Sequence, residues 1–162
     1  CPMGVSEKLA ILLDRPIDGF GHVYGDVIFE DPAKRPFNLH INPFGRPLLI
    51  SHMGGCYGAE MEKLSDEAMM ALAMEAMVEA FGSGIRARVV KTLRTHWASD
   101  PHALGGYSHA KPGKAASRLK FQETVGDRIV LAGEHCSIPF YSTVHGAHLS
   151  GIAAAEKATR LL

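Results

Sequence analysis

The sequence predicts a mixed α/β (α+β) fold, because segments with strand patterns and segments with helix patterns both occur along it. Short apolar runs bounded by turn residues, such as 46–53, indicate strands. Apolar residues between 66 and 81 recur at steps of three and four, which is typical of an amphipathic helix. A second, Ala-rich helix is predicted from Ser142 or Thr143 to about residue 161.

The first half of the chain has the pattern of strands separated by turns. Asp14-Arg15-Pro16 ends the first strand, and Asn42–Gly45 joins two later strands into an antiparallel hairpin. A hydroxyl cap at Ser65, followed by two acids, begins the helix, and Gly82 ends it. The methionines of this helix favour a core stripe over an adaptable binding face. The predicted strands are 7–13, 27–29, 37–41 and 46–53.

The second half alternates strands and loops before the final helix. Residues 109–117 are small and polar, as in a surface loop, and 119–123 fit either a short helix or an extended segment. Further strands are predicted at 87–93 and 128–132. The second of these leads through a Gly-Glu turn and a loop into the C-terminal helix.

Composition and charge exclude several classes of function. The 162 residues are 46% hydrophobic and 21% charged, which is enough for a buried core in one domain or two small lobes. Lys plus Arg and Asp plus Glu both number 17, so no net charge favours nucleic acid or an anionic membrane surface. No apolar run approaches the about 20 residues of a spanning helix, no signal-peptide pattern is present, and three distant cysteines do not suggest a disulfide scaffold. We expect a cytoplasmic protein, with a periplasmic or secreted location as the alternative.

The stretch 132–147, AGEHCSIPFYSTVHGA, carries the strongest local indication of a ligand site. Glu134 follows a strand and Gly133, where a carboxylate accepts hydrogen bonds from ribose or ribityl hydroxyls; a turn acid in solvent is the alternative. The helix start at Thr143–Ala147 offers unpaired N–H groups and a positive dipole end. These groups suit the N1–C2=O edge of a flavin, which gains negative charge on reduction. An ordinary helix start packed on a sheet is the alternative.

Other reactive side chains have weaker patterns. From local sequence alone, Lys8 has the character of a surface charge and Trp97 that of a core residue. The histidines and the cysteine at 135, 136, 145 and 148 fit no compact zinc pattern, so no metal site is predicted. A nucleophilic Cys–His pair that uses Cys1 or Cys136 lacks an orienting third group.

Four segments together resemble the flavin-containing amine oxidase family of polyamine oxidases, monoamine oxidases and lysine-specific histone demethylases. They occur in the family's order and span nearly the whole chain, and the last two are the most specific. The segments are MGVSEKLAILLDRP (3–16), LLISHMGGCYGAEMEKLSDEAM (48–69), RTHWASDPHALGGYSHAKPG (94–113) and RIVLAGEHCSIPFYSTVHGAHLSGIAAAEKA (128–158).

The resemblance implies a division into domains and roles for individual residues. Residues 1–94 correspond to part of a mixed-sheet substrate-binding domain, and 95–162 complete a Rossmann-like FAD-binding domain with its last strand and helix. Lys8 falls at the catalytic position, where the family keeps a lysine that holds a water at flavin N5. Phe140 and Tyr141 fall where aromatic walls enclose the substrate amine. The residues implied to bind the cofactor are Trp97, Gly106, Tyr107, Gly133, Glu134, Thr143, Val144, His145 and Ala147.

Two departures from the family shape the expected assembly. Gly106 stands where monoamine oxidases carry the cysteine joined to the flavin, so FAD is expected to be held noncovalently. The G-x-G-x-x-G turn of the family's N-terminal half is absent, because Gly19-Phe-Gly21 has the wrong spacing. We therefore expect a fragment, a proteolytic product or a small subunit that works with a larger chain carrying the ADP-binding half, as a dimer of such heterodimers. The start at Cys1-Pro2 fits a cut inside a longer precursor.

The implied function is FAD-dependent oxidation of an amine or amino acid to an imine. Hydride transfer goes to flavin N5, and O2 reoxidises the flavin to give H2O2. A noncatalytic assembly partner and an amine dehydrogenase with another electron acceptor are the alternatives. The substrate stays open, because a polyamine needs carboxylates along a tunnel, and an amino acid needs an arginine, for which Arg35 and Arg46 are candidates.

Overall fold

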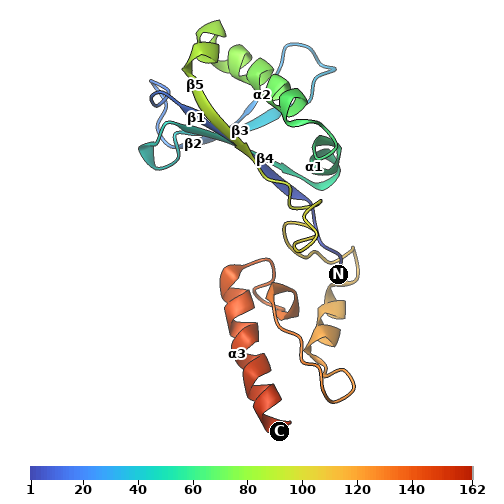
Figure 1. Cartoon of the computed structure of the whole chain (residues 1–162). Coiled ribbons are helices and arrows are strands. Elements are labelled where there is room, and N and C mark those ends of the chain that lie inside the picture. Colours follow the sequence, from blue (N-terminus) through green and yellow to red (C-terminus); the bar gives the residue numbers. More distant parts are fainter. Residues whose placement is uncertain (162) are drawn as a thin grey trace. The chain divides into compact units, whose positions relative to one another are not determined.

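The computed structural model describes residues 1–161, and the contacts within the chain divide it into two compact units (Figure 1). The first, which we call the sheet unit, is Val5–His102. The second, the helix unit, comprises Cys1–Gly4 and the chain from Ala103 onward. The predicted domains 1–94 and 95–162 refer to a whole oxidase and stay a prediction.

The sheet unit is built on an antiparallel sheet, which within residues 1–161 has five strands in the order β2-β3-β4-β1-β5 (Figure 1). Together with the helices, this sheet confirms the predicted mixed α/β fold class. The predicted strand at 27–29 overlaps the observed one by a single residue, because pairing with β3 places that strand earlier in the chain. The strands are β1 (Ser6–Leu13), β2 (Val23–Val27), β3 (Phe37–Ile41), β4 (Leu48–Gly54) and β5 (Val89–Arg94).

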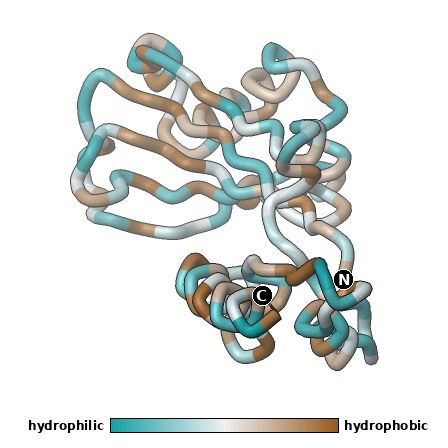
Figure 2. The backbone as a smooth tube through the Cα atoms, turned by 60° about the horizontal axis from the view of Figure 1, so that its bottom comes forward, coloured by the Kyte–Doolittle hydropathy of each residue, from teal (hydrophilic) through white to brown (hydrophobic). Residues whose placement is uncertain are grey.

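Alternation along the strands puts the core on one face of the sheet. Leu9, Ile11 and Leu13 of β1 are buried, whereas the residues between them are more exposed. Figure 2 shows the corresponding hydrophobic segments along the strands. The buried side chains pack against α2 (Asp66–Phe81), which buries Met69 and Met77 in the same cluster and confirms the predicted core stripe.

The helices of the sheet unit begin and end at residues suited to those places. Ser65 caps α2 by accepting a hydrogen bond from the Ala68 N–H at 3.2 Å, and Gly82 ends the helix with φ of 79°. Helix α1 (Gly55–Met61) was not predicted, because seven residues are too few to show a helical period. The 3-10 helices of this unit are η1 (Pro43–Gly45) and η2 (Ser83–Arg88).

The helix unit contains α3 (Val144–Arg160) and the 3-10 helices η3 (Ala115–Gln122) and η4 (Glu134–Cys136). The predicted helix start is confirmed, because Thr143 is the N-cap of α3. The predicted strand at 128–132 is wrong: Ile129 makes an isolated bridge with Val125 and is 56% exposed. A strand needs a hydrogen-bonded neighbour along its length, and within residues 1–161 this segment has none. Among residues 1–161 no helix is long and apolar enough to cross a membrane.

Candidate functional site

Lys8 and Trp97, the two residues of the sheet unit with predicted roles at the flavin ring, lie at the ends of neighbouring strands. Lys8 is on β1 and belongs to the alternate set that faces away from the core. It lies directly opposite His52 of β4. Trp97 follows β5, which pairs with β1, and its side chain is 45% exposed. The exposure of Trp97 does not fit the local interpretation of this residue as core.

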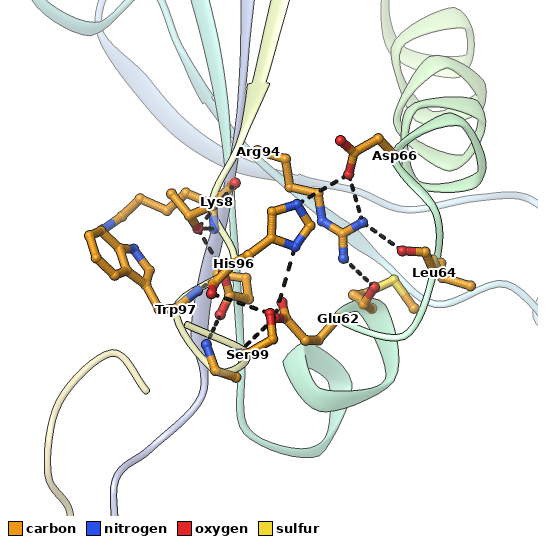
Figure 3. A network of polar contacts seen from close by, with 12 residues as sticks. Lys8, Glu62, Leu64, Asp66, Arg94, His96, Trp97 and Ser99 are labelled. Atoms are coloured by element: carbon orange, nitrogen blue, oxygen red, sulfur yellow. Dashed lines mark hydrogen bonds and ion pairs between the residues drawn. The ribbon is translucent and has the colours of Figure 1, made fainter. Parts of the chain in front are cut away.

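A small network of hydrogen bonds connects the backbones of these two residues (Figure 3). The Lys8 N–H donates to Thr95 Oγ1 at 2.8 Å, and the Thr95 N–H donates to the Lys8 carbonyl at 2.9 Å. The Thr95 hydroxyl donates to Glu7 Oε2 at 2.8 Å, and the Trp97 N–H donates to the same oxygen at 3.1 Å. The Ala98 N–H donates to Glu7 Oε1 at 3.0 Å. Figure 3 shows the side chains of Lys8 and Trp97 extending to the same side of this network.

Sequence reasoning missed Glu7, although its place in the alternation pointed to it. Leu9, Ile11 and Leu13 share its face of β1, so a strand pattern places an acid among core residues. Acids are almost never fully buried unless they have partners, and a fully buried acid therefore marks a specific network. Glu7 is 0% exposed.

A second layer of polar contacts fixes the segment after β5 to the helices (Figure 3). The buried Arg94 guanidinium donates at 2.6 Å to the carbonyl of Met61, the last residue of α1, and at 2.8 Å to that of Leu64, and it pairs with Asp66 at 3.2 Å. Glu62 accepts hydrogen bonds from the N–H and the hydroxyl of Ser99 at 3.2 and 2.7 Å. His96 lies between the two acids, 3.3 Å from Asp66 and 3.9 Å from Glu62.

Aromatic rings cover the sheet next to Lys8. The rings of Tyr24 and His40 stack with centroids 3.7 Å apart, and His22 stacks on His40 at 4.5 Å. Burial and the charge of His22 lower the pKa of His40 below its usual range, and burial and the charge of Lys8 lower that of His52. The imidazoles of His40 and His52 are therefore neutral at pH 7, and Lys8 supplies the positive charge beside His52.

In the helix unit, Glu134 organises a second network. Its carboxylate accepts hydrogen bonds from the Ser108 N–H at 2.7 Å, the Ser108 hydroxyl at 2.8 Å and the Ser142 N–H at 2.7 Å. Burial opposes the charged form, but these hydrogen bonds and the nearby Arg118 charge outweigh it and lower the pKa of Glu134. Glu134 is therefore a carboxylate that joins two segments of this unit, in place of the solvent-exposed turn acid considered from sequence.

Arg118 and Ser108 are further residues that sequence reasoning missed. The buried Arg118 donates to the Ser108 hydroxyl at 2.7 Å and to the Ser108 carbonyl at 3.2 Å. Its guanidinium also lies over the Tyr141 ring, 4.4 Å from the centroid. Tyr141 and Phe140 are about half exposed. No local signal marks Arg118, because its partners are distant in the chain.

The start of α3 has free donors at its first positions. The Thr143 hydroxyl accepts from the Gly146 N–H at 3.0 Å, and the Thr143 carbonyl accepts from the Ala147 N–H at 3.1 Å. Within residues 1–161, the N–H groups of Val144 and His145 have no acceptor. Val144 is 89% exposed, so an outside acceptor has access to this helix start.

The remaining residues with predicted cofactor roles take part in the backbone of the helix unit. The Gly106 N–H donates to the Gly4 carbonyl at 2.9 Å, and the Tyr107 carbonyl accepts from the Gly4 N–H at 2.6 Å. Gly133 has φ of 140° and exchanges hydrogen bonds with the Ser150 hydroxyl at 2.9 and 2.7 Å. The structure thus gathers Gly133, Glu134 and the α3 start in one unit, and Lys8 with Trp97 in the other. Their roles toward a flavin stay predictions.

The cysteines and histidines of residues 1–161 form no metal site and no disulfide. Within the part of the chain that the structure describes, no three His, Cys, Asp or Glu side chains are grouped so that they could hold a metal ion. The three cysteines are free thiols. Burial and the charge of Glu134 raise the pKa of the Cys136 thiol, which makes it a poor nucleophile.

Comparison with known proteins relates this chain to flavin-dependent amine oxidoreductases. A profile of the family described as flavin containing amine oxidoreductase matches residues 1–159. Polyamine oxidase 5 of Oryza sativa subsp. japonica is 36% identical over 162 residues, which cover 99% of this chain and 32% of that protein. Polyamine oxidase 4 of the same organism is 36% identical over 157 residues, covering 96% of this chain and 31% of that protein.

The similarity extends to proteins with a different named activity. Lysine-specific histone demethylase 1 homolog 1 of Oryza sativa subsp. japonica is 30% identical over 169 residues, which cover 97% of this chain and 19% of that protein. The chain therefore spans about a third of the length of the polyamine oxidases it matches, and less of the demethylase.

Proposed function

Because this chain belongs to the flavin-containing amine oxidoreductase family, we propose that it forms one part of an FAD-dependent amine oxidase. When bound, FAD supplies the two-electron oxidation of an amine to an imine, and O2 then takes up the electrons to give H2O2. The residues of this chain contribute orientation, hydrogen bonding and charge. The sheet unit carries Lys8, and the helix unit carries the α3 start.

The observation that carries the proposal is the network joining Lys8 and Trp97. Residues far apart in the sequence are held in one frame by Thr95, through hydrogen bonds of 2.8 and 2.9 Å to the Lys8 backbone. Lys8 projects from the open face of β1, beside the neutral His52. In this role its ammonium, with three donor hydrogens, would hold a water at flavin N5. Trp97 forms a wall on the same side.

The donor set of the helix unit fits the electron-rich edge of a flavin. The Val144 and His145 N–H groups at the start of α3 are unused within residues 1–161, and the exposed Val144 leaves them accessible. An acceptor that gains negative charge is stabilised by such donors and by the helix dipole. Phe140 and Tyr141, both about half exposed, are proposed as aromatic walls for the amine.

Two further parts of the proposal concern assembly. A larger polypeptide that carries the dinucleotide-binding half is needed, because the residues present supply no G-x-G-x-x-G turn. Gly106 offers no side chain for a covalent link, so FAD is held noncovalently. Acid precipitation of the purified flavoprotein therefore releases the yellow flavin into the supernatant; flavin retained on this chain overturns noncovalent binding.

The decisive experiment is flavin reduction by an amine in the absence of oxygen. The protein is purified with the chains that accompany it and mixed with spermidine, phenylethylamine or lysine. Lys8→Met lowers the rate of flavin reduction by at least about tenfold, because a positioned donor is lost. Lys91→Met is the matched control, since Lys91 pairs with Leu12 and shares the face of Lys8, and its rate stays within about twofold.

Other outcomes of the same experiment favour the alternatives. Full flavin content with unchanged reduction in Lys8→Met favours a noncatalytic assembly role for this chain. Reduction by an amine without reoxidation by O2 identifies an amine dehydrogenase with another electron acceptor. A preparation with no flavin and no accompanying chain contradicts the proposal.

A further inference from the structure

Glu7 is a fully buried carboxylate whose partners are all donors from one short segment. The Thr95 hydroxyl and the Trp97 N–H reach Oε2 at 2.8 and 3.1 Å, and the Ala98 N–H reaches Oε1 at 3.0 Å. Both oxygens are needed as acceptors, and no hydrogen on the side chain is needed. Glutamine, which has the same size, does not meet these conditions, because it has one acceptor oxygen and two donor hydrogens.

Burial of a charged group opposes folding, because the group loses its hydration. Glu7 is 0% exposed and has no ion pair with Lys, Arg or His within residues 1–161. Burial of a carboxylate is unfavourable unless donors satisfy its oxygens. Apolar neighbours on the same face of β1 stabilise the core without this cost. The carboxylate therefore serves the geometry of residues 95–98 more than the stability of the core.

The geometry ties that segment to Lys8 through a single hydroxyl. Thr95 Oγ1 accepts from the Lys8 N–H at 2.8 Å and donates to Glu7 at 2.8 Å. The carboxylate orients this hydroxyl, because an acceptor-only group forces the Thr95 hydrogen toward itself and leaves a lone pair for Lys8. The same oxygen of Glu7 holds the Trp97 backbone.

We propose that Glu7 is a positioning residue of the amine-oxidising site, which acts by holding the backbones of Lys8 and Trp97 in one fixed arrangement. It does not touch substrate or cofactor; it acts through these two residues. The inference rests on the proposed function of Lys8. The hydrogen bonds that fix Thr95, Trp97 and Ala98 to Glu7 do not depend on a flavin.

The first test measures positioning directly in the purified protein with its accompanying chains. Hydrogen exchange is followed by mass spectrometry in Glu7→Gln and in Glu62→Gln. Glu62 is the matched control because it holds Ser99 of the same segment without contacting Lys8 or Trp97. In Glu7→Gln the amides of Trp97 and Ala98 exchange at least about tenfold faster, while the β2–β3 ladder is unchanged. Unchanged amides at 97 and 98, or faster exchange throughout the sheet, overturn the proposal.

The second test is a double-mutant cycle on anaerobic flavin reduction. Glu7→Gln lowers the rate about tenfold in the wild-type background, since small displacements of a positioned group are costly. In the Lys8→Met background the same change has a smaller effect, because only the part that acts through Trp97 remains. Equal factors in both backgrounds overturn the role through Lys8. Loss of rate in Glu7→Gln with a normal rate in Lys8→Met contradicts the assignment of Lys8 as well.

The two tests separate failure of the inference from failure of the proposed function. If no amine reduces the flavin of the wild-type protein, the proposed function fails. Hydrogen exchange then still decides whether Glu7 positions residues 95–98. Glu7→Asp serves as the conservative variant: it keeps both oxygens, and partial recovery of slow exchange at Trp97 and Ala98 supports the requirement for a carboxylate.

Discussion

Glu7 and Glu134 are two carboxylates with the same kinds of partner in different settings. Each accepts from one serine or threonine hydroxyl and from two backbone N–H groups. Glu7 is buried completely in a strand of a sheet, whereas Glu134 lies in a 3-10 turn, partly exposed, with the charge of Arg118 nearby. The donors to Glu7 lie in residues 95–98, directly after β5, the neighbour of β1 in the sheet, and within residues 1–161 no cation pairs with this carboxylate. The donors to Glu134 lie in non-helical segments of the helix unit, where Arg118 adds a positive charge.

The largest effect is expected when Glu134 is removed. Glu134→Ala leaves the Ser108 and Ser142 donors unpaired and leaves Arg118 without a nearby negative charge, so we expect a loss of about 2–4 kcal/mol in unfolding free energy. We also expect weaker retention of flavin. Thermal unfolding and flavin content after gel filtration measure the two effects.

The control for this change is Glu156→Ala, on an exposed turn of α3, which makes only an i,i+4 ion pair with Arg160 at 3.8 Å. Its effect stays within about 0.5 kcal/mol. A similar loss in both variants contradicts the structural role of the Glu134 network.

The next effect concerns the close packing at the start of α3. A Cβ at position 146 overlaps the Phe140 carbonyl oxygen, so Gly146→Ala forces the helix start away from this loop and costs about 1–3 kcal/mol. Gly151→Ala, in the same helix, meets nothing within 4 Å and is expected to stabilise by about 0.5–1 kcal/mol. Thermal unfolding of both variants checks the opposite signs. Shifts in the same direction show that helix propensity outweighs the contact.

A smaller effect compares the two helix caps. Thr143 caps α3 by accepting from Gly146 at 3.0 Å, and Ser65 caps α2 by accepting from Ala68 at 3.2 Å. Replacement of either by Ala costs about 1 kcal/mol in the stability of its own unit. Hydrogen exchange localises each loss. Faster exchange in α2 of Thr143→Ala contradicts this localisation of the loss.

Acidification is expected to give the smallest effect and to act on the two units at different pH. The folded-state pKa of His40 and of His52 is lowered from 6.5, so the unfolded state takes up more protons and stability falls as pH drops below about 6.5. The pKa of Glu134 is lowered from 4.5, so its contribution is lost only as pH falls below about 4.5 and through the folded pKa. Exchange protection in β2–β4 weakens first, and protection near Ser108 later. Simultaneous loss contradicts this order.

Features that depend on neighbours in the sequence could be predicted, and features that depend on distant partners could not. Period and capping identified α2 and the start of α3, because a helix satisfies its own hydrogen bonds. The segment 128–132 has a strand pattern, but a strand forms only where a neighbouring strand exists. Glu134 was found through its motif. Glu7 and Arg118 were missed, since their roles arise from residues 10 to 91 positions away.

The strand order separates the Glu7–Thr95 frame, the hydrogen bonds that join Glu7, Lys8, Thr95 and Trp97, from the β2 edge of the sheet. Lys8 and Trp97 belong to β1 and to the end of β5, which are neighbours, whereas β2 lies at the opposite edge beyond β4 and β3. Changes in the length or sequence of the loop before β2 therefore leave the Glu7–Thr95 frame intact. The molecule is modular in this sense: changes at the β2 edge, around Tyr24 and its stacked histidines, leave the lysine and the tryptophan in their mutual position.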